Sequence, residues 1–187
     1  MTSSLKNRIE LAKYFAELGF TEGAEVGVFT GYFSEVMFQN IPALHLYCVD
    51  IWGEGKYQRA EEACLERLKP YNATIIKNYS VEAAKQVPDG SLDFVYIDGA
   101  HDYTNVKADI EAWAPKVKVG GIISGDDFYQ GKSGGMGVMK AVTEYCNNLY
   151  TNGMPREYHY NLKLTLWDDN NPIRDDRQPN WYFVKDQ

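Results

Sequence analysis

The stretch Ala24-Glu25-Val26-Gly27-Val28-Phe29-Thr30-Gly31-Tyr32-Phe33-Ser34 decides the fold class of this chain. It reads as a short apolar strand, a tight turn bearing Gly27 and Gly31, and the first turn of a helix. Glycine lets backbone approach a ligand closely or take a positive φ at little cost. The following helix offers unpaired N–H groups and the positive end of its dipole. The stretch predicts a nucleotide-type binding corner, and an ordinary β–α turn with incidental glycines is the alternative.

Outward from this corner, short apolar strands alternate with helical patterns. Further strands are expected at 44–49, 73–76, 92–97 and 122–124, and helices at 5–18, 32–40, 57–69, 81–86, 104–116 and 137–150. This alternation predicts a parallel sheet with helices on both faces. After Pro155 two strands, 159–167 and 181–184, are expected with only a polar loop between them, which predicts an antiparallel hairpin at the sheet edge.

Composition narrows the partners and the compartment. The net charge is −7 and no basic stripe is visible, so nucleic acid is not an expected partner. No apolar run reaches the ~18 residues of a membrane span and no signal core is present, so we expect a cytoplasmic protein without a membrane partner. Cys48, Cys64 and Cys146 lack metal spacing and are expected to be buried thiols.

The carboxyl ends of the expected strands gather polar and acidic residues, where ligands bind in open α/β sheets. Asp50 lies 23 residues after Gly27, close to the ~20 at which an acid reaches ribose hydroxyls. A helix cap or a solvated loop residue is the alternative for Asp50. Ile51 and Trp52 are placed to cover a flat base, although Trp52 also fits a core position.

Glu25 distinguishes between possible ligands of the first turn. The spacing from Gly27 to Gly31 is Gly-x-x-x-Gly, so the usual dinucleotide fingerprint is absent. A glutamate would repel a pyrophosphate and suits a cationic amino group instead. The turn therefore favours a nucleoside that bears an amino-acid tail over NAD.

Several motifs together resemble one known family. They are Glu25-x-Gly27-x-x-x-Gly31, Asp50, Ser91-Leu-Asp-Phe-Val-Tyr-Ile-Asp98-Gly-Ala-His101-Asp-Tyr103 and Val119-Gly-Gly-Ile-Ile-Ser-Gly-Asp126-Asp127-Phe128. Over roughly residues 20–145 the chain resembles class I S-adenosylmethionine-dependent methyltransferases. The later motifs are similar to the small-molecule group that includes catechol O-methyltransferases, macrocin-type O-methyltransferases and cephalosporin-hydroxylase-like proteins.

The resemblance implies a Rossmann-like α/β fold, with a seven-stranded, mostly parallel sheet and a C-terminal antiparallel hairpin. It implies one methyltransferase domain over 1–187, composed of an N-terminal helix (1–20), a cofactor-binding core (21–150) and the hairpin (151–187). The residues implied in binding S-adenosylmethionine are Glu25, Gly27 and Gly31 around the methionine part, Asp50 at the ribose, Ile51, Trp52, Tyr79 and Ser80 near the adenine, together with Phe29, Thr30 and Asp98.

Asp98, Asp126 and Asp127 form a second group at adjacent strand ends. Three carboxylates repel one another unless a cation neutralises them, and an oxygen-only set suits Mg²⁺ or Ca²⁺. In metal-dependent relatives a matching trio binds Mg²⁺ and orients a substrate hydroxyl. The alternative is that Asp126 caps a turn and Asp127 pairs with a base.

His101 lies three residues after Asp98, where the catechol enzymes carry a lysine base. Neutral imidazole could accept the hydroxyl proton as the methyl group transfers, with Asp98 beside it as the second catalytic residue. His101 could instead bond only to its neighbours or position a ligand.

These observations predict metal-assisted O-methylation of a small hydroxylated molecule by an S-adenosylmethionine-dependent enzyme. Two other hypotheses stay open: an oxygenase like the cephalosporin hydroxylases, and a non-catalytic cofactor-binding module. Gly131-Lys132-Ser133 mimics the end of a P-loop but lacks its first glycine, and residues 131–137 are expected to form a gate. The pocket is open or completed by a second copy of the chain, so a homo-oligomer is possible.

Overall fold

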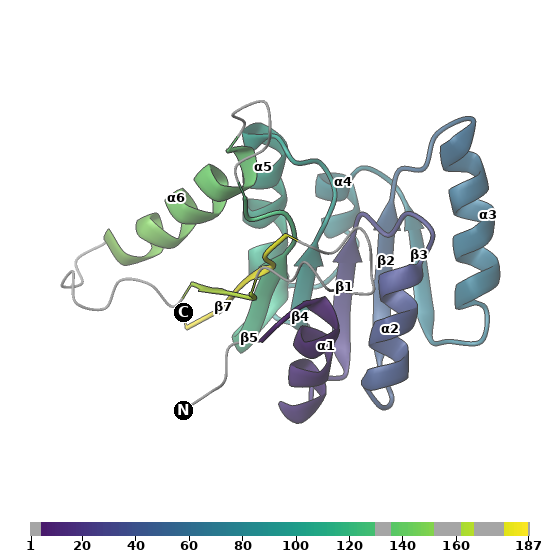
Figure 1. Cartoon of the computed structure of the whole chain (residues 1–187), viewed down its shortest axis with the longest axis horizontal. Coiled ribbons are helices and arrows are strands. Elements are labelled where there is room, and N and C mark those ends of the chain that lie inside the picture. Colours follow the sequence, from purple (N-terminus) through teal and green to yellow (C-terminus); the bar gives the residue numbers. More distant parts are fainter. Residues whose placement is uncertain (1–4, 130–135, 152–161, 167–177, 187) are drawn as a thin grey trace.

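The computed structural model describes residues 5–129, 136–151, 162–166 and 178–186 (Figure 1). The strands are β1 (Glu22–Val26), β2 (His45–Asp50), β3 (Ala73–Lys77), β4 (Leu92–Ile97), β5 (Val117–Gly125), β6 (Lys163–Leu164) and β7 (Trp181–Val184). The helices are α1 (Arg8–Glu17), α2 (Tyr32–Asn40), α3 (Lys56–Leu68), α4 (Ser80–Ala84), α5 (Tyr103–Trp113) and α6 (Gly137–Thr151), with a 3₁₀ turn at Ala114–Lys116.

The described strands form one seven-stranded sheet in the order β3-β2-β1-β4-β5-β7-β6. The first five strands in this order pair in parallel, while β7 runs antiparallel to both β5 and β6. The expected Rossmann-like sheet with its C-terminal antiparallel pair is therefore confirmed. The strand order reverses between β1 and β4, which is the point where ligands bind in open α/β sheets.

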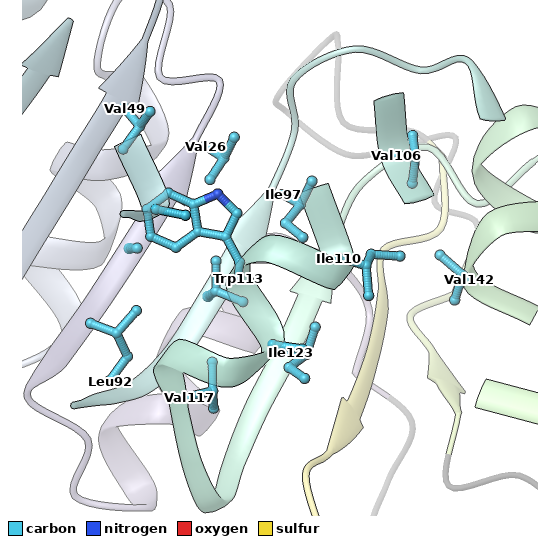
Figure 2. Close-up of a cluster of buried hydrophobic side chains, with 14 of the residues drawn as sticks. Val26, Val49, Leu92, Ile97, Val106, Ile110, Trp113, Val117, Ile123 and Val142 are labelled. Atoms are coloured by element: carbon cyan, nitrogen blue, oxygen red, sulfur yellow. The ribbon is translucent and has the colours of Figure 1, made fainter. Parts of the chain in front are cut away.

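Two hydrophobic clusters cover the two faces of the sheet. Val95 and Ile97 of β4 belong to a cluster that includes Trp113 and residues of α4, α5 and α6, and Figure 2 shows Ile97 among its labelled members. Their neighbours Phe94 and Tyr96 point the other way, into a cluster that α1, α2 and α3 complete. This alternation follows from the two-residue period of a strand, and it explains why β4 is apolar throughout.

Helix α1 packs along β4 in the opposite direction. The Asn7 side chain caps the helix, because its Oδ1 accepts the N–H groups of Ile9 and Glu10, each at 3.1 Å. Phe15, near the end of α1, stacks on Phe94 with ring centroids 4.4 Å apart. The start of α1 consequently lies at the carboxyl ends of the strands.

Strand β5 is longer than its sequence predicts. The Gly120-Gly121 pair reads as a turn, yet the strand begins at Val117. Gly120 has φ +85°, and the pairing between β4 and β5 shifts register near this point, as a bulge does. The Gly120 N–H donates to the Lys185 carbonyl at 2.7 Å and the Lys185 N–H donates to Gly121 at 2.8 Å. The C-terminal segment thus supplies partners that the local sequence does not reveal.

Other expectations fall partly outside the described residues. Of the strand expected at 159–167, the structure describes 162–166, and only β6 is extended and paired. Residues 131–135 of the expected gate and most of the loop 168–180 lie outside the described ranges, and Gly137 begins α6. Within those ranges, no helix has both the length and the apolar character that crossing a membrane demands. The three cysteines are free and buried, as expected.

Truncating Phe94 tests the packing of α1 on the sheet. Phe94 is fully buried, so Phe94→Ala is expected to lower the free energy of unfolding by about 3–5 kcal/mol. Urea unfolding followed by circular dichroism measures this change. Val119→Ala is the control, because Val119 is 67% exposed and its truncation is expected to have little effect. A loss at Phe94 no larger than that at Val119 would contradict this packing.

Candidate active site

The sheet register brings the predicted acidic residues to one edge. Val26 pairs with Val49 on one side and with Ile97 on the other, and Ile97 pairs with Gly125. The residues that follow these four are the ones singled out in the sequence: Gly27, Asp50, Asp98 and Asp126. The first turn and the aspartates therefore share the carboxyl edge of four adjacent strands.

The glycines of the first turn are required by packing. Gly27 has φ +92°, and a Cβ there would overlap the backbone carbonyl of Asp98. Gly31 has φ +74° at the N-cap of α2, where a Cβ would lie 3.2 Å from the Cys64 sulfur. Both residues use conformations that only glycine adopts cheaply. The turn after β1 consequently lies directly against the turn after β4.

Asp50 holds the first turn while keeping acceptor capacity. Its Oδ2 accepts the Phe29 N–H at 2.8 Å, and its Oδ1 accepts the Trp52 N–H at 2.8 Å. An ionised carboxylate has about four lone-pair sites, so each oxygen can accept another hydrogen bond. The contact of Asp50 with ribose hydroxyls stays a prediction.

Trp52 and Ser80 make hydrogen bonds that hold the backbone and side chains beneath the carboxyl edge of the sheet in place. Trp52 is buried and its Nε1–H donates to the Phe29 carbonyl at 2.7 Å, so the structure favours the core alternative for this indole. The Ser80 hydroxyl accepts the Trp113 Nε1–H at 2.9 Å. Both hydrogen bonds fix turns at this edge; Trp52 is buried, whereas Ser80 is half-buried.

Exposed apolar side chains surround the same edge. Phe29, Ile51 and Tyr79 are 48%, 53% and 71% exposed. Together they offer apolar surface that a flat ligand could cover. Tyr57 joins them from the first turn of α3, edge-on to Phe29 with ring centroids 6.3 Å apart. Nothing in the sequence distinguished Tyr57 from other surface aromatic residues.

Glu25 lies beneath the turn rather than at its surface. It is buried, and the Ser34 hydroxyl donates to its Oε2. Burial raises the Glu25 pKa to about 8, with Asp98 and Asp50 adding to the rise against a hydrogen bond from Ser34 and the charge of Arg8. Without a bound cation this carboxyl is mostly neutral at pH 7, so the negative charge inferred from sequence must develop when a cation arrives.

His101 lies between two aspartates on the outer side of the edge. Its Nδ1 is 3.0 Å from Asp127 Oδ2 and its Nε2 is 3.5 Å from Asp98 Oδ1. Hydrogen bonds to Asp127 and then to Asp98 raise the His101 pKa to about 10, against partial desolvation. The ring is therefore an imidazolium at neutral pH. Asp127 does pair with a base, as one alternative held, and that base is His101.

Asp126 faces away from this group. It is buried, and its Oδ2 lies 2.5 Å from Nη2 of Arg8. Its Oδ1 has no hydrogen-bond partner among the described residues, and burial raises the Asp126 pKa to about 8. The ligand atoms that lie within 4.8 Å of one another belong to Asp98, His101 and Asp127. The structure thus replaces Asp126 with His101 in the candidate cation group.

Arg8 is the functional candidate that the sequence reading missed. Its Nη1 also lies 3.3 Å from Asp98 Oδ2, so one guanidinium joins two of the three aspartates. The signal was present, because Arg8 lies on the same helical face as Leu5, Ala12 and Phe15. A charge on an apolar face, together with a surplus of buried acids elsewhere, indicates an internal ion pair.

Backbone strain concentrates at the same edge. Phe29, Trp52 and Asp127 have φ of +51°, +28° and +60°, and they follow β1, β2 and β5. Non-glycine residues rarely take such values, and strained residues gather at ligand sites. A Cβ at Gly137 would overlap the His101 carbonyl, so the start of α6 also packs against the His101 loop.

Residues 24–128 match the family described as "Methyltransferase domain", which covers more than half of the chain. The chain belongs to this family. The expected class, an S-adenosylmethionine-dependent methyltransferase, is confirmed by the family match together with the fold. Arg8 and α1 lie outside the matched residues of this methyltransferase domain.

Relatives of this methyltransferase domain are distant. The uncharacterized protein y4gI of Sinorhizobium fredii is 26% identical over 132 residues, which is 67% of this chain but only 14% of that protein. An O-methyltransferase from Bacillus cereus in complex with SAH has a TM-score of 0.66 at 17% identity, covering 95% and 80% of the two chains. An rRNA methylase from Streptococcus thermophilus has a TM-score of 0.65 at 14% identity, covering 99% and 100%. These structures share the fold.

The buried acid of the first turn gives a pH-dependent prediction. The folded pKa of Glu25 is about 8 against an ordinary 4.5, so the stability that its bound proton provides is present at low pH and is lost as pH rises from 4.5 through 8. Glu25→Gln keeps the acceptor for Ser34 without the charge. At pH 8 it is expected to raise the free energy of unfolding by on the order of 4 kcal/mol.

Urea unfolding of both proteins from pH 5 to 9 measures this difference. Glu66→Gln, an exposed substitution on α3, controls for the change from acid to amide. A Glu25→Gln curve parallel to wild type at every pH would contradict a raised pKa.

Proposed function

We propose that this methyltransferase transfers a methyl group from S-adenosylmethionine to a hydroxyl of a small molecule, with a divalent cation assisting. One observation carries the proposal. The predicted cofactor turn lies directly beside the Asp98–His101–Asp127 group, because Gly27 packs against the backbone carbonyl of Asp98. A ligand in the first turn and a hydroxyl beside Asp127 would thus be neighbours.

The cofactor half of the site is supported by its donors and surfaces. Asp50 would accept hydrogen bonds from the ribose hydroxyls. The turn at Phe29 and Thr30 would lie along the methionine part of the cofactor. Exposed Ile51 and Tyr79 would flank the adenine. A cationic amino group close to Glu25 would lower the pKa of that carboxyl, so cofactor binding at pH 7 is accompanied by release of a proton.

The donor set also fits a divalent cation. Asp98 and Asp127 provide carboxylate oxygens and His101 an imidazole nitrogen within 4.8 Å of one another. Two carboxylates with room for water suit Mg²⁺, and the added nitrogen also admits Mn²⁺. Asp98 and Asp127 would hold the ion, and a bound ion of this kind lowers the pKa of a substrate hydroxyl.

The chain's own residues would perform positioning and proton handling. Holding the hydroxyl oxygen in line with the sulfonium methyl supplies much of the acceleration through proximity. In the free site His101 is an imidazolium between two carboxylates. With a cation held by Asp98 and Asp127, His101 would lose that proton to solvent, and the neutral ring could then accept the proton that the hydroxyl loses. Asp127 then fixes the orientation of the ring through Nδ1.

Other functions remain rivals with different signatures. A 2-oxoglutarate oxygenase uses an iron site with two histidines and one carboxylate, whereas the group found in the described residues contains only His101. A fold shared with an rRNA methylase raises nucleic acid as a substrate, but a net charge of −7 opposes binding to phosphates. A binding module without catalysis would hold the cofactor and ignore the cation.

Calorimetry with S-adenosylmethionine, with and without Mg²⁺, separates these rivals. The methyltransferase proposal expects cofactor binding, and formation of S-adenosylhomocysteine when catechols, phenols or hydroxy acids are supplied with Mg²⁺. Cofactor binding without product across that panel favours the binding module. Absence of cofactor binding overturns the proposal.

Two alanine substitutions divide the cofactor site from the cation site. Asp127→Ala removes one proposed cation ligand, so metal-dependent turnover is expected to fall at least ~100-fold while cofactor affinity changes little. Asp50→Ala removes the ribose acceptor, so cofactor affinity is expected to fall ~10-fold or more. Turnover assays across a Mg²⁺ series and calorimetry measure these effects. Equal loss of cofactor affinity in both variants would contradict the cation assignment.

A further inference from the structure

The strongest unexplained feature of the site is the position of Arg8. This residue comes from α1, outside the matched methyltransferase segment, yet its guanidinium is buried among carboxylates. Nη2 contacts Asp126 and Nη1 contacts Asp98. A single planar group therefore joins the acids that follow two neighbouring strands, β4 and β5.

Aromatic rings fix the orientation of this guanidinium. Its central carbon lies 5.3 Å from the centroid of Phe33 and 5.9 Å from that of Tyr96. Both rings are buried, so the side chain has little rotamer freedom left to lose when it binds a carboxylate. Arginine can address two acids through separate nitrogens, whereas the ammonium of lysine is one point charge.

Asp98 is shared between two cationic partners. Its Oδ2 faces Arg8 on the inner side and its Oδ1 faces His101 on the outer side. Asp126, the other Arg8 partner, belongs wholly to the inner side, and Asp127 contacts His101 on the outer side. The acidic cluster is thereby divided at Asp98, which has one oxygen committed to each half.

We propose that Arg8 is a positioning residue for the proposed methyl transfer: it holds Asp126 and Asp98 Oδ2 on the inner side of the acidic cluster. Asp98 is thereby oriented with its Oδ1 toward His101 and its backbone carbonyl against the cofactor turn at Gly27. The inference rests on the proposed function for its consequence in cofactor binding. Helix α1 accordingly completes the site of a domain whose family match begins only at residue 24.

A purely structural ion pair is the competing explanation, and a charge-balanced variant distinguishes the two. Arg8→Met alone strands the buried Asp126 and risks unfolding. Arg8→Met with Asp126→Asn replaces both partners of this buried pair together, so the thermal midpoint is expected to recover toward that of Asp126→Asn. The double variant then differs from the single one in lacking Arg8, and with it the contact to Asp98.

Two measurements compare the double variant with Asp126→Asn. Calorimetry with S-adenosylmethionine is expected to show a dissociation constant about tenfold higher in the double variant. Imidazole ¹⁵N NMR is expected to show a shifted His101 signal, assigned by its loss in His101→Gln, because Asp98 no longer faces the ring. Arg8→Lys, if folded, is expected to show the same shift. Lys118→Met, which removes a cation at the opposite sheet edge, should leave both readings unchanged.

The outcomes separate cleanly. A double variant with recovered stability but unchanged His101 signal and cofactor affinity would overturn the positioning role and leave a structural ion pair. A shifted His101 signal with weakened cofactor binding supports it. If the wild-type protein binds no S-adenosylmethionine, the proposed function fails, and the His101 signal alone then decides the role of Arg8.

Discussion

The contact between two turns governs the rest of this structure. Strands β1 and β4 are neighbours although β2 and β3 separate them in sequence, and the turns that follow them touch at Gly27 and Asp98. A side chain at residue 27 would force these turns apart. The cofactor turn and the acidic turn are therefore close because the backbone is close, whatever the surrounding loops contain. Asp50 then ties the first turn to β2 through its two backbone contacts.

Charge balance is the second constraint on this edge. Glu25, Asp98, Asp126 and Asp127 gather at this edge, and Glu25 and Asp126 are buried there. Two cationic side chains offset this negative charge: Arg8 on the inner side and His101 on the outer side. Burial also keeps the Glu25 carboxyl largely protonated. Because the protein already fixes the positions of these carboxyl groups, a positively charged ligand would need little rearrangement of the site to bind.

The sequence predicted features that depend on local pattern. The apolar runs and their periods located the strands and helices, and the aspartates at the strand ends identified the functional edge. Contacts between segments far apart in the chain could not be predicted from these local patterns. Nothing local places Arg8 between Asp98 and Asp126, and Lys185 extends β5 only because the C-terminal segment returns to it. Trp52 was ambiguous for a related reason, since burial depends on what packs against the residue.

The strand order also bears on how the chain acquires its structure during synthesis. The neighbours of β1 are β2, completed by residue 50, and β4, which ends at residue 97. Until the second of these emerges from the ribosome, one hydrogen-bonding edge of β1 and the apolar face of α1 lack their native cover. Segments in that condition are prone to pair with other chains. We therefore expect the nascent chain to be most prone to aggregation in the interval between synthesis of β2 and synthesis of β4.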